Sequence, residues 1–170
     1  MGQLLGESGA DWQAWKAKIC SAVGENGKVL VDGIPELERI IGAQPPAVEL
    51  SGSAAQNRFN RIFERFIATF TTREHPLTIF IDDLQWADSA SLNLLKVLMG
   101  KSRSQHLLLL GAFRDNEVYP AHPLMRTLRD LDNGRASISR VTLAPLSQRH
   151  INQLVADILN CGAEQARPLA

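Results

Sequence analysis

The sequence lacks four features that would each place it in a particular class of protein. Lysine plus arginine and aspartate plus glutamate both number 18, so there is no basic excess of the kind that nucleic-acid-binding modules carry. Two cysteines, Cys20 and Cys161, form neither a disulfide framework nor a metal motif and favour a reducing cytoplasm. No apolar run reaches the roughly 18 residues of a membrane span. The first residues lack the basic and apolar regions of a secretory signal.

A phosphate-binding loop of the form G-x-x-x-x-G-K-[ST] is also missing. In that motif the backbone N–H groups cradle phosphates, while the hydroxyl contacts Mg²⁺. The stretch GENGKV, residues 24–29, places Ala22 where the first glycine belongs and Val29 where the hydroxyl belongs. The stretch LGESGA, residues 5–10, is followed by Asp11 and Trp12 in place of Gly-Lys. We expect neither stretch to bind phosphate.

What is present is enough for one domain with a real core: 170 residues, of which 45% are hydrophobic. The most informative stretch is LTIFIDDLQWAD, residues 77–88. Its apolar run predicts a strand buried on both faces, as in parallel sheets covered by helices. Asp82 and Asp83 follow directly, where such sheets bind ligands. A simpler interpretation is that the two acids only end the strand.

A second apolar run, HLLLLGAF at residues 106–113, precedes Arg114. Two buried strands that each end in charged residues, with one helix between them, predict a parallel βαβ unit. The intervening helix should begin after Asp88 as N-cap and end near Met99. Gln85 and Trp86 fall in the turn beside the acids, where we expect Trp86 to pack on the helix, although it could instead line the edge of a ligand site. Residues 100–104 form a polar break.

Helices are expected on either side of this unit. The spacing of apolar residues predicts one over residues 11–23 with Asp11 as N-cap, one over 54–71, one over 124–131 and one over 148–159. Pro35 suits the first turn of another helix. Residues 43–53 read as a proline-containing linker, and Ser137–Leu143 as a third strand.

The string DDLQWADSASLNLL, with IPELERIIGAQPPAVEL before it and GAFRDNEV after it, resembles one group of ATPases. These are the STAND-type, origin-recognition-complex-like AAA ATPase domains of large bacterial signalling proteins, where they are joined to kinase, cyclase or regulator modules. The resemblance implies an α/β fold: a partial P-loop NTPase with a three-layer αβα core and parallel strands. The Walker A strand-loop-helix and most of the lid would be missing.

The resemblance also implies roles for three residues. Asp82 would be the Walker B acid that binds Mg²⁺ with the nucleotide, and Asp83 would activate or position the attacking water. Arg114, at the sensor 1 position, would contact the γ-phosphate and stabilise charge on it. Arg114 could instead form only an ion pair with a nearby acid. The implied cofactors are ATP and Mg²⁺, both dependent on the missing Walker A element.

The expected domain boundaries follow the same resemblance. Residues 1–160 would be a partial ATPase domain, with a helical segment and linker at 1–53, the core at 54–146, the start of the lid at 147–160 and a tail at 161–170. We expect a fragment of a regulatory ATPase, inactive alone, whose partners are other domains of a signalling protein or a second copy. The alternative is a degenerate remnant that acts as a non-enzymatic interaction module. A third hypothesis, a nucleic-acid-binding origin-recognition protein, is disfavoured by the zero net charge.

Overall fold

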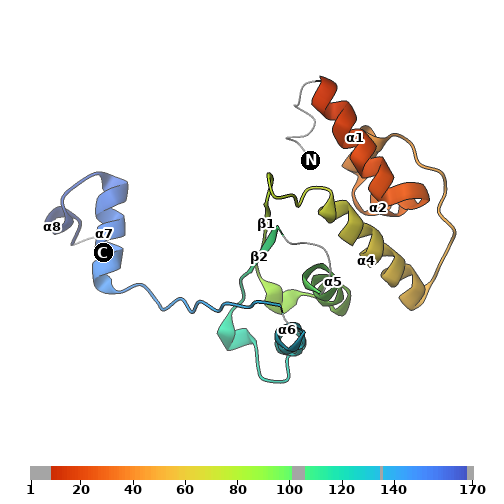
Figure 1. Cartoon of the computed structure of the whole chain (residues 1–170). Coiled ribbons are helices and arrows are strands. Elements are labelled where there is room, and N and C mark those ends of the chain that lie inside the picture. Colours follow the sequence, from red (N-terminus) through yellow and green to blue (C-terminus); the bar gives the residue numbers. More distant parts are fainter. Residues whose placement is uncertain (1–8, 101–105, 135, 168–170) are drawn as a thin grey trace. The chain divides into compact units, whose positions relative to one another are not determined.

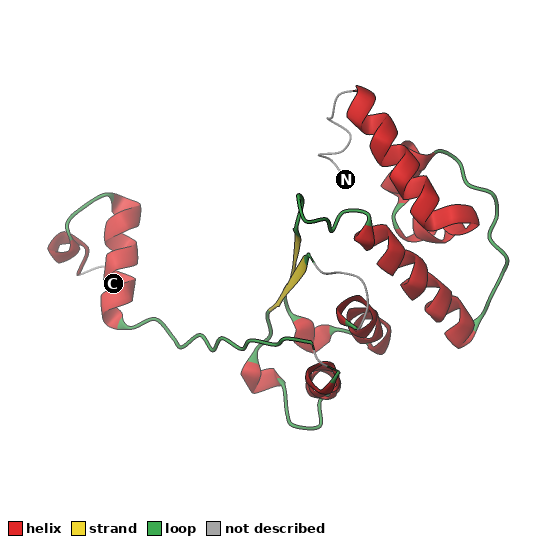
Figure 2. Cartoon of the chain, in the orientation of Figure 1, coloured by secondary structure: helices red, strands yellow, loops and turns green. Residues whose placement is uncertain are grey.

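The computed structural model describes residues 9–100, 106–134 and 136–167, and the predicted polar break at 100–104 lies almost wholly outside them. The chain separates into two compact units, Met1–Ser137 and Ile138–Ala170. The first holds most of the helices and the sheet, and the second holds two helices (Figures 1 and 2). None of the helices in the described part of the chain is both long and apolar enough to cross a membrane.

The first unit begins with a helical layer. It comprises α1 (Gly9–Val23), α2 (Gly27–Gly33), α3 (Glu38–Ile41) and α4 (Gly52–Ala68), with 3-10 turns at Gly24–Asn26 and Pro35–Leu37. The chain leaves α1 through Gly24, whose φ of 54° suits glycine because it has no Cβ to clash. Asp11 lies inside α1, so its predicted role as N-cap is wrong. Helix α4 begins two residues before the predicted start and ends three residues early.

The buried faces of these helices form one apolar core. Ring contacts extend it, since Trp15 stacks on Phe70 with centroids 5.3 Å apart and Phe66 meets Phe70 edge-on at 5.1 Å. The amphipathic pattern of α4 therefore identified its buried side correctly. The most deeply buried members of this core are Ile19, Leu30, Leu37, Ile40 and Val23.

The predicted βαβ unit is confirmed. Strand β1 (Leu77–Ile81) and strand β2 (Leu107–Gly111) pair in parallel, with Leu77 opposite Leu107 and Ile81 opposite Gly111. Helix α5 (Ser89–Met99) lies between them in sequence, and the Asp88 carboxylate accepts a hydrogen bond from the Ser91 N–H at 2.7 Å as its N-cap. The fold class is therefore α/β with parallel strands, as predicted.

Only one face of this sheet is covered. Leu77, Ile79 and Leu107 pack against the helical core, and Leu109 packs against a second cluster formed by α5, α6 (Pro123–Asn133) and the turn after β1. On the opposite face Phe80 is 64% exposed, and Leu108 and Leu110 are also exposed. The expectation that β1 is buried on both faces is therefore wrong, because no described element packs on that second face.

The predicted third strand is also wrong. Ser137–Leu143 has no regular secondary structure, and the sheet in the described residues has two strands. Its β-branched residues favour a strand, but strand propensity is realised only when a neighbouring strand supplies pairing and packing. Val141 is 80% exposed and Leu143 is 88% exposed, so this segment has neither a pairing strand nor a packing surface beside it among the described residues.

The second unit contains α7 (Gln148–Leu159) and α8 (Ala163–Ala166). Helix α7 has the predicted bounds, because the Ser147 hydroxyl caps its start by accepting from the His150 N–H. Its end is marked by Asn160, which adopts a left-handed conformation with φ of 49°. The short helix α8 lies within the segment expected to be a tail.

Candidate functional site

The candidate site lies where the two parallel strands end. Strand β1 ends at Ile81 and is followed by Asp82 and Asp83, whereas β2 ends at Gly111 and leads to Arg114. The carboxyl ends of parallel strands share one edge of the sheet, so these residues from distant parts of the sequence meet there. The backbone holds the two exits together, because the Leu84 N–H donates to the Ala112 carbonyl at 2.9 Å.

Asp83 has an uncommon backbone conformation. Its φ of 52° and ψ of 40° lie in the left-handed region, which among residues other than glycine is adopted mainly by asparagine and aspartate. Two hydrogen bonds hold the turn: the Asp83 N–H donates to Asp82 Oδ1 at 2.8 Å, and the Trp86 N–H donates to the Asp83 carbonyl at 2.9 Å. The turn thus directs the two neighbouring carboxylates to different positions.

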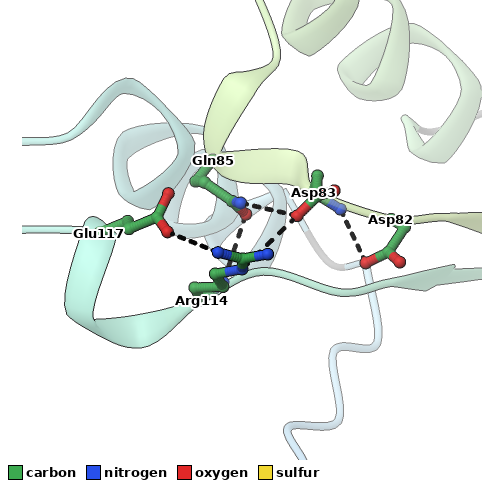
Figure 3. A network of polar contacts seen from close by, with 5 residues as sticks. All are labelled: Asp82, Asp83, Gln85, Arg114 and Glu117. Carbon is green, nitrogen blue, oxygen red and sulfur yellow. Dashed lines mark hydrogen bonds and ion pairs between the residues drawn. The ribbon is translucent and has the colours of Figure 1, made fainter.

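Arg114 faces two carboxylates (Figure 3). Its Nη1 donates to Glu117 Oε1 at 3.2 Å, and its Nε lies 3.9 Å from Asp83 Oδ1. The exposed fractions are 66% for the Arg114 side chain, 55% for Asp83 and 29% for Glu117, so both ion pairs lie at the surface and the Glu117 side is partly buried. The structure therefore contains the ion pair that was the simpler interpretation of Arg114. Exposed pairs of this kind exchange partners readily, because each contributes about 1 kcal/mol or less.

Gln85 joins these groups and was not assigned a role from the sequence. Its Nε2 donates to Asp83 Oδ1 at 2.8 Å, and its Oε1 accepts from the Arg114 N–H at 3.3 Å. The nearby Trp86 is 75% exposed, so its predicted packing is wrong. A sequence signal for Gln85 did exist: it is a polar residue in an otherwise apolar turn, two positions after Asp83. No sequence signal predicted the hydrogen bond between Gln85 and Arg114, which are 29 residues apart.

The donor set suits a magnesium ion that is shared with phosphate groups. No cluster of three or more histidine, cysteine, aspartate or glutamate side chains suitable for a metal occurs among the described residues. Mg²⁺ is commonly held by one or two carboxylates, with water and substrate phosphates as its other ligands. Asp82 and Asp83 are exposed carboxylates that fit this pattern. They do not form an all-protein cage such as Ca²⁺ uses.

In open α/β sheets, ligands bind beyond the carboxyl ends of the parallel strands, which is where the two acids and the arginine lie. The AAA ATPase domain family matches residues 1–110, and the chain belongs to that family. The matched region includes Asp82 and Asp83 and ends before Arg114.

One curated relative is the hybrid signal transduction histidine kinase G of Dictyostelium discoideum, 34% identical over 96 residues. The similar region covers 56% of this chain and only 3% of that protein. The chain thus spans a small part of the relative's length. No solved structure matches the chain.

Proposed function

We propose that this chain contributes the magnesium-binding and water-positioning half of an ATP-hydrolysing switch domain in a signal-transduction protein. The observation that carries this proposal is the meeting of Asp83 and Arg114 across the ends of two neighbouring parallel strands. Family membership supports the ATPase chemistry, and the histidine kinase relative supports the signalling context. The more specific assignment to STAND-type domains rests on the DDLQWAD and GAFRDNEV strings.

Each residue has a separate role in this proposal. Asp82 holds Mg²⁺ on the nucleotide, and Asp83 orients the attacking water and accepts its proton. Arg114 exchanges its contact with Glu117 for one with the γ-phosphoryl oxygens, whose negative charge it offsets. ATP and Mg²⁺ supply the transferable phosphoryl group and its counter-charge. Because the sequence contains no G-x-x-x-x-G-K-[ST] motif, we expect the isolated chain to bind nucleotide weakly and the site to be completed within a longer, cytoplasmic protein.

The test compares Mg²⁺·ATP binding and turnover by the 170-residue chain with the same chain joined behind a strand-loop-helix segment that carries G-x-x-x-x-G-K-[ST]. Calorimetry should detect binding only in the joined protein. Asp82→Asn should then weaken Mg²⁺·ATP binding, whereas Asp83→Asn should leave binding nearly unchanged and lower turnover by about 100-fold or more. If both variants lose binding and turnover to the same extent, Asp82 and Asp83 do not have separate roles. If Asp82→Asn leaves Mg²⁺·ATP binding and turnover unchanged, Asp82 does not hold the metal.

A second candidate function is a non-enzymatic interaction module. The observation that favours it is the open apolar face of the sheet, formed by Phe80, Leu108 and Leu110. Exposed apolar patches beside an unpaired strand edge mark association sites. If the joined protein does not bind Mg²⁺·ATP but the chain self-associates through this face, the interaction module replaces the ATPase proposal.

A further inference from the structure

Gln85 is buried in the middle of an exposed site. It lies on the 3-10 turn Leu84–Trp86, and its exposed fraction is 8%, whereas the side chains of Asp83 and Arg114 are more than half exposed. A buried amide is stable only when its polar atoms have hydrogen-bond partners. Both partners of Gln85 belong to the proposed catalytic groups, one after each strand (Figure 3).

The chemistry of these partners permits only one orientation of the amide. The Asp83 carboxylate can only accept a hydrogen bond, and the Arg114 backbone N–H can only donate one. Gln85 must therefore direct Nε2 toward Asp83 Oδ1 and Oε1 toward Arg114, as the distances of 2.8 and 3.3 Å show. Glutamate lacks the donor, and asparagine is one methylene shorter. The site thus needs a side chain with the length, donor and acceptor of glutamine.

We propose that Gln85 is a positioning residue that ties the Asp83 carboxylate to the backbone at Arg114, so that the ends of β1 and β2 keep a fixed separation. This rests on the proposed function, in which Asp83 and Arg114 act on the same phosphoryl group. Gln85 and Arg114 both approach Oδ1 of Asp83. Neither contact involves Oδ2, so in the proposed function this oxygen is the one left to accept the proton of the attacking water.

The two hydrogen bonds of Gln85, to the Asp83 carboxylate and from the Arg114 N–H, form a bridge between the strand ends. Three variants test these two hydrogen bonds separately. Gln85→Met keeps the side-chain length and removes both hydrogen bonds. Gln85→Glu keeps the acceptor for the Arg114 N–H but places a carboxylate against Asp83. The double variant Gln85→Glu/Asp83→Asn restores a donor and acceptor pair with the roles reversed. The matched control is Gln153→Met, because Gln153 Nε2 donates to Asp157 Oδ1 at the same 2.8 Å on α7.

The first measurement is amide hydrogen exchange by NMR on the 170-residue chain, which requires no nucleotide. In Gln85→Met the Arg114 amide should exchange about tenfold faster, whereas the Leu84 amide, bonded to the Ala112 carbonyl, should stay within about twofold and report an intact turn. Gln85→Glu and the double variant should retain protection at Arg114. Unchanged exchange at Arg114 in Gln85→Met would overturn the bridge.

The second measurement is ATP turnover in the joined protein. Gln85→Glu should lower kcat by about tenfold with KM for Mg²⁺·ATP within about twofold, because Asp82 and the metal are undisturbed. Gln153→Met should change neither constant. An unchanged kcat in Gln85→Glu would overturn the positioning role. If the joined protein binds no Mg²⁺·ATP, the proposed function fails, but the exchange experiment still decides whether Gln85 fixes the two strand ends.

Discussion

At the scale of single residues, the site is organised by the left-handed conformation of Asp83. Such a conformation costs an L-residue about 1 kcal/mol, and the surrounding hydrogen bonds offset it. The Asp82 carboxylate, the Trp86 N–H and the Gln85 amide each contact Asp83. Asp82 thus contributes to the turn as well as to the proposed metal site. Together these contacts hold the Asp83 carboxylate at the end of β1.

Arg114 provides a prediction at this scale. Since its ion pairs with Asp83 and Glu117 are exposed, Arg114→Ala should change the free energy of unfolding by about 1 kcal/mol or less. Turnover in the joined protein should nevertheless fall by at least about 100-fold, because the phosphoryl charge loses its partner. Chemical denaturation and a phosphate-release assay measure the two effects. Arg129→Ala on α6 is the control, and a similar loss of turnover there would contradict the role of Arg114.

At the scale of secondary-structure elements, helix α5 depends on a charged cap. The Asp88 carboxylate accepts from the backbone N–H of Ser91, and this hydrogen bond holds the Asp88 pKa below its ordinary value. Because the folded-state pKa is depressed, the stabilisation is present above the unfolded-state pKa and is lost as the pH falls through the folded-state pKa. The stability of α5 is therefore linked to pH.

This linkage predicts how a cap variant behaves. Asp88→Ala should lower the melting temperature at pH 7, and its difference from the parent should shrink as the pH falls below the ordinary range for carboxyl groups. Asp88→Ser retains an uncharged cap, so the difference in melting temperature between Asp88→Ser and Asp88→Ala should not vary with pH. Thermal melts across a pH series measure both differences. A gap between the parent and Asp88→Ala that is constant with pH would contradict the linkage.

The two faces of β1 give a second prediction for elements. Ile79 packs into the helical core, and its neighbour Phe80 points to the open face. Ile79→Lys should lower the free energy of unfolding by roughly 2 kcal/mol or more, since it buries a charge in an apolar layer. Phe80→Lys should change it by about 1 kcal/mol or less and reduce self-association.

Denaturation and light scattering distinguish these outcomes. Equal destabilisation by the two β1 variants would mean that the face bearing Phe80 is covered. Association that persists in Phe80→Lys would place the contact elsewhere on the molecule.

At the scale of the whole molecule, the chain consists of two units joined through a segment without regular secondary structure. The division falls between Ser137 and Ile138, and the following residues up to Ser147 are exposed. Exposed segments with few backbone hydrogen bonds are the preferred sites of proteolysis.

Limited trypsin digestion should therefore cut early after Arg140. Arg58 on α4 should resist cleavage, because its helix is packed and its Nη1 donates to the Val48 carbonyl. Mass spectrometry of the first products identifies the bond that is cut, and circular dichroism of the larger product tests whether it stays folded. An earlier cut within α4, β1 or α5 would show that the first unit opens more easily than the connecting segment.

The sequence by itself determined the elements whose signals are local. The apolar runs at β1 and β2 predicted two parallel strands, Asp88 marked the start of α5, and the apolar stripe of α4 identified its buried face. It also placed Asp82, Asp83 and Arg114 after strands that share one edge. These predictions succeeded because hydrogen bonding and periodicity act within a few residues.

Only the tertiary structure decided what depends on distant neighbours. Ser137–Leu143 has the residues of a strand and no strand beside it, and Phe80 belongs to a strand that is covered on one face only. The contact of Gln85 with the Arg114 backbone joins residues 29 positions apart. Pairing, burial and side-chain bridges are set by which surfaces meet in space, and that information is not contained in local sequence patterns.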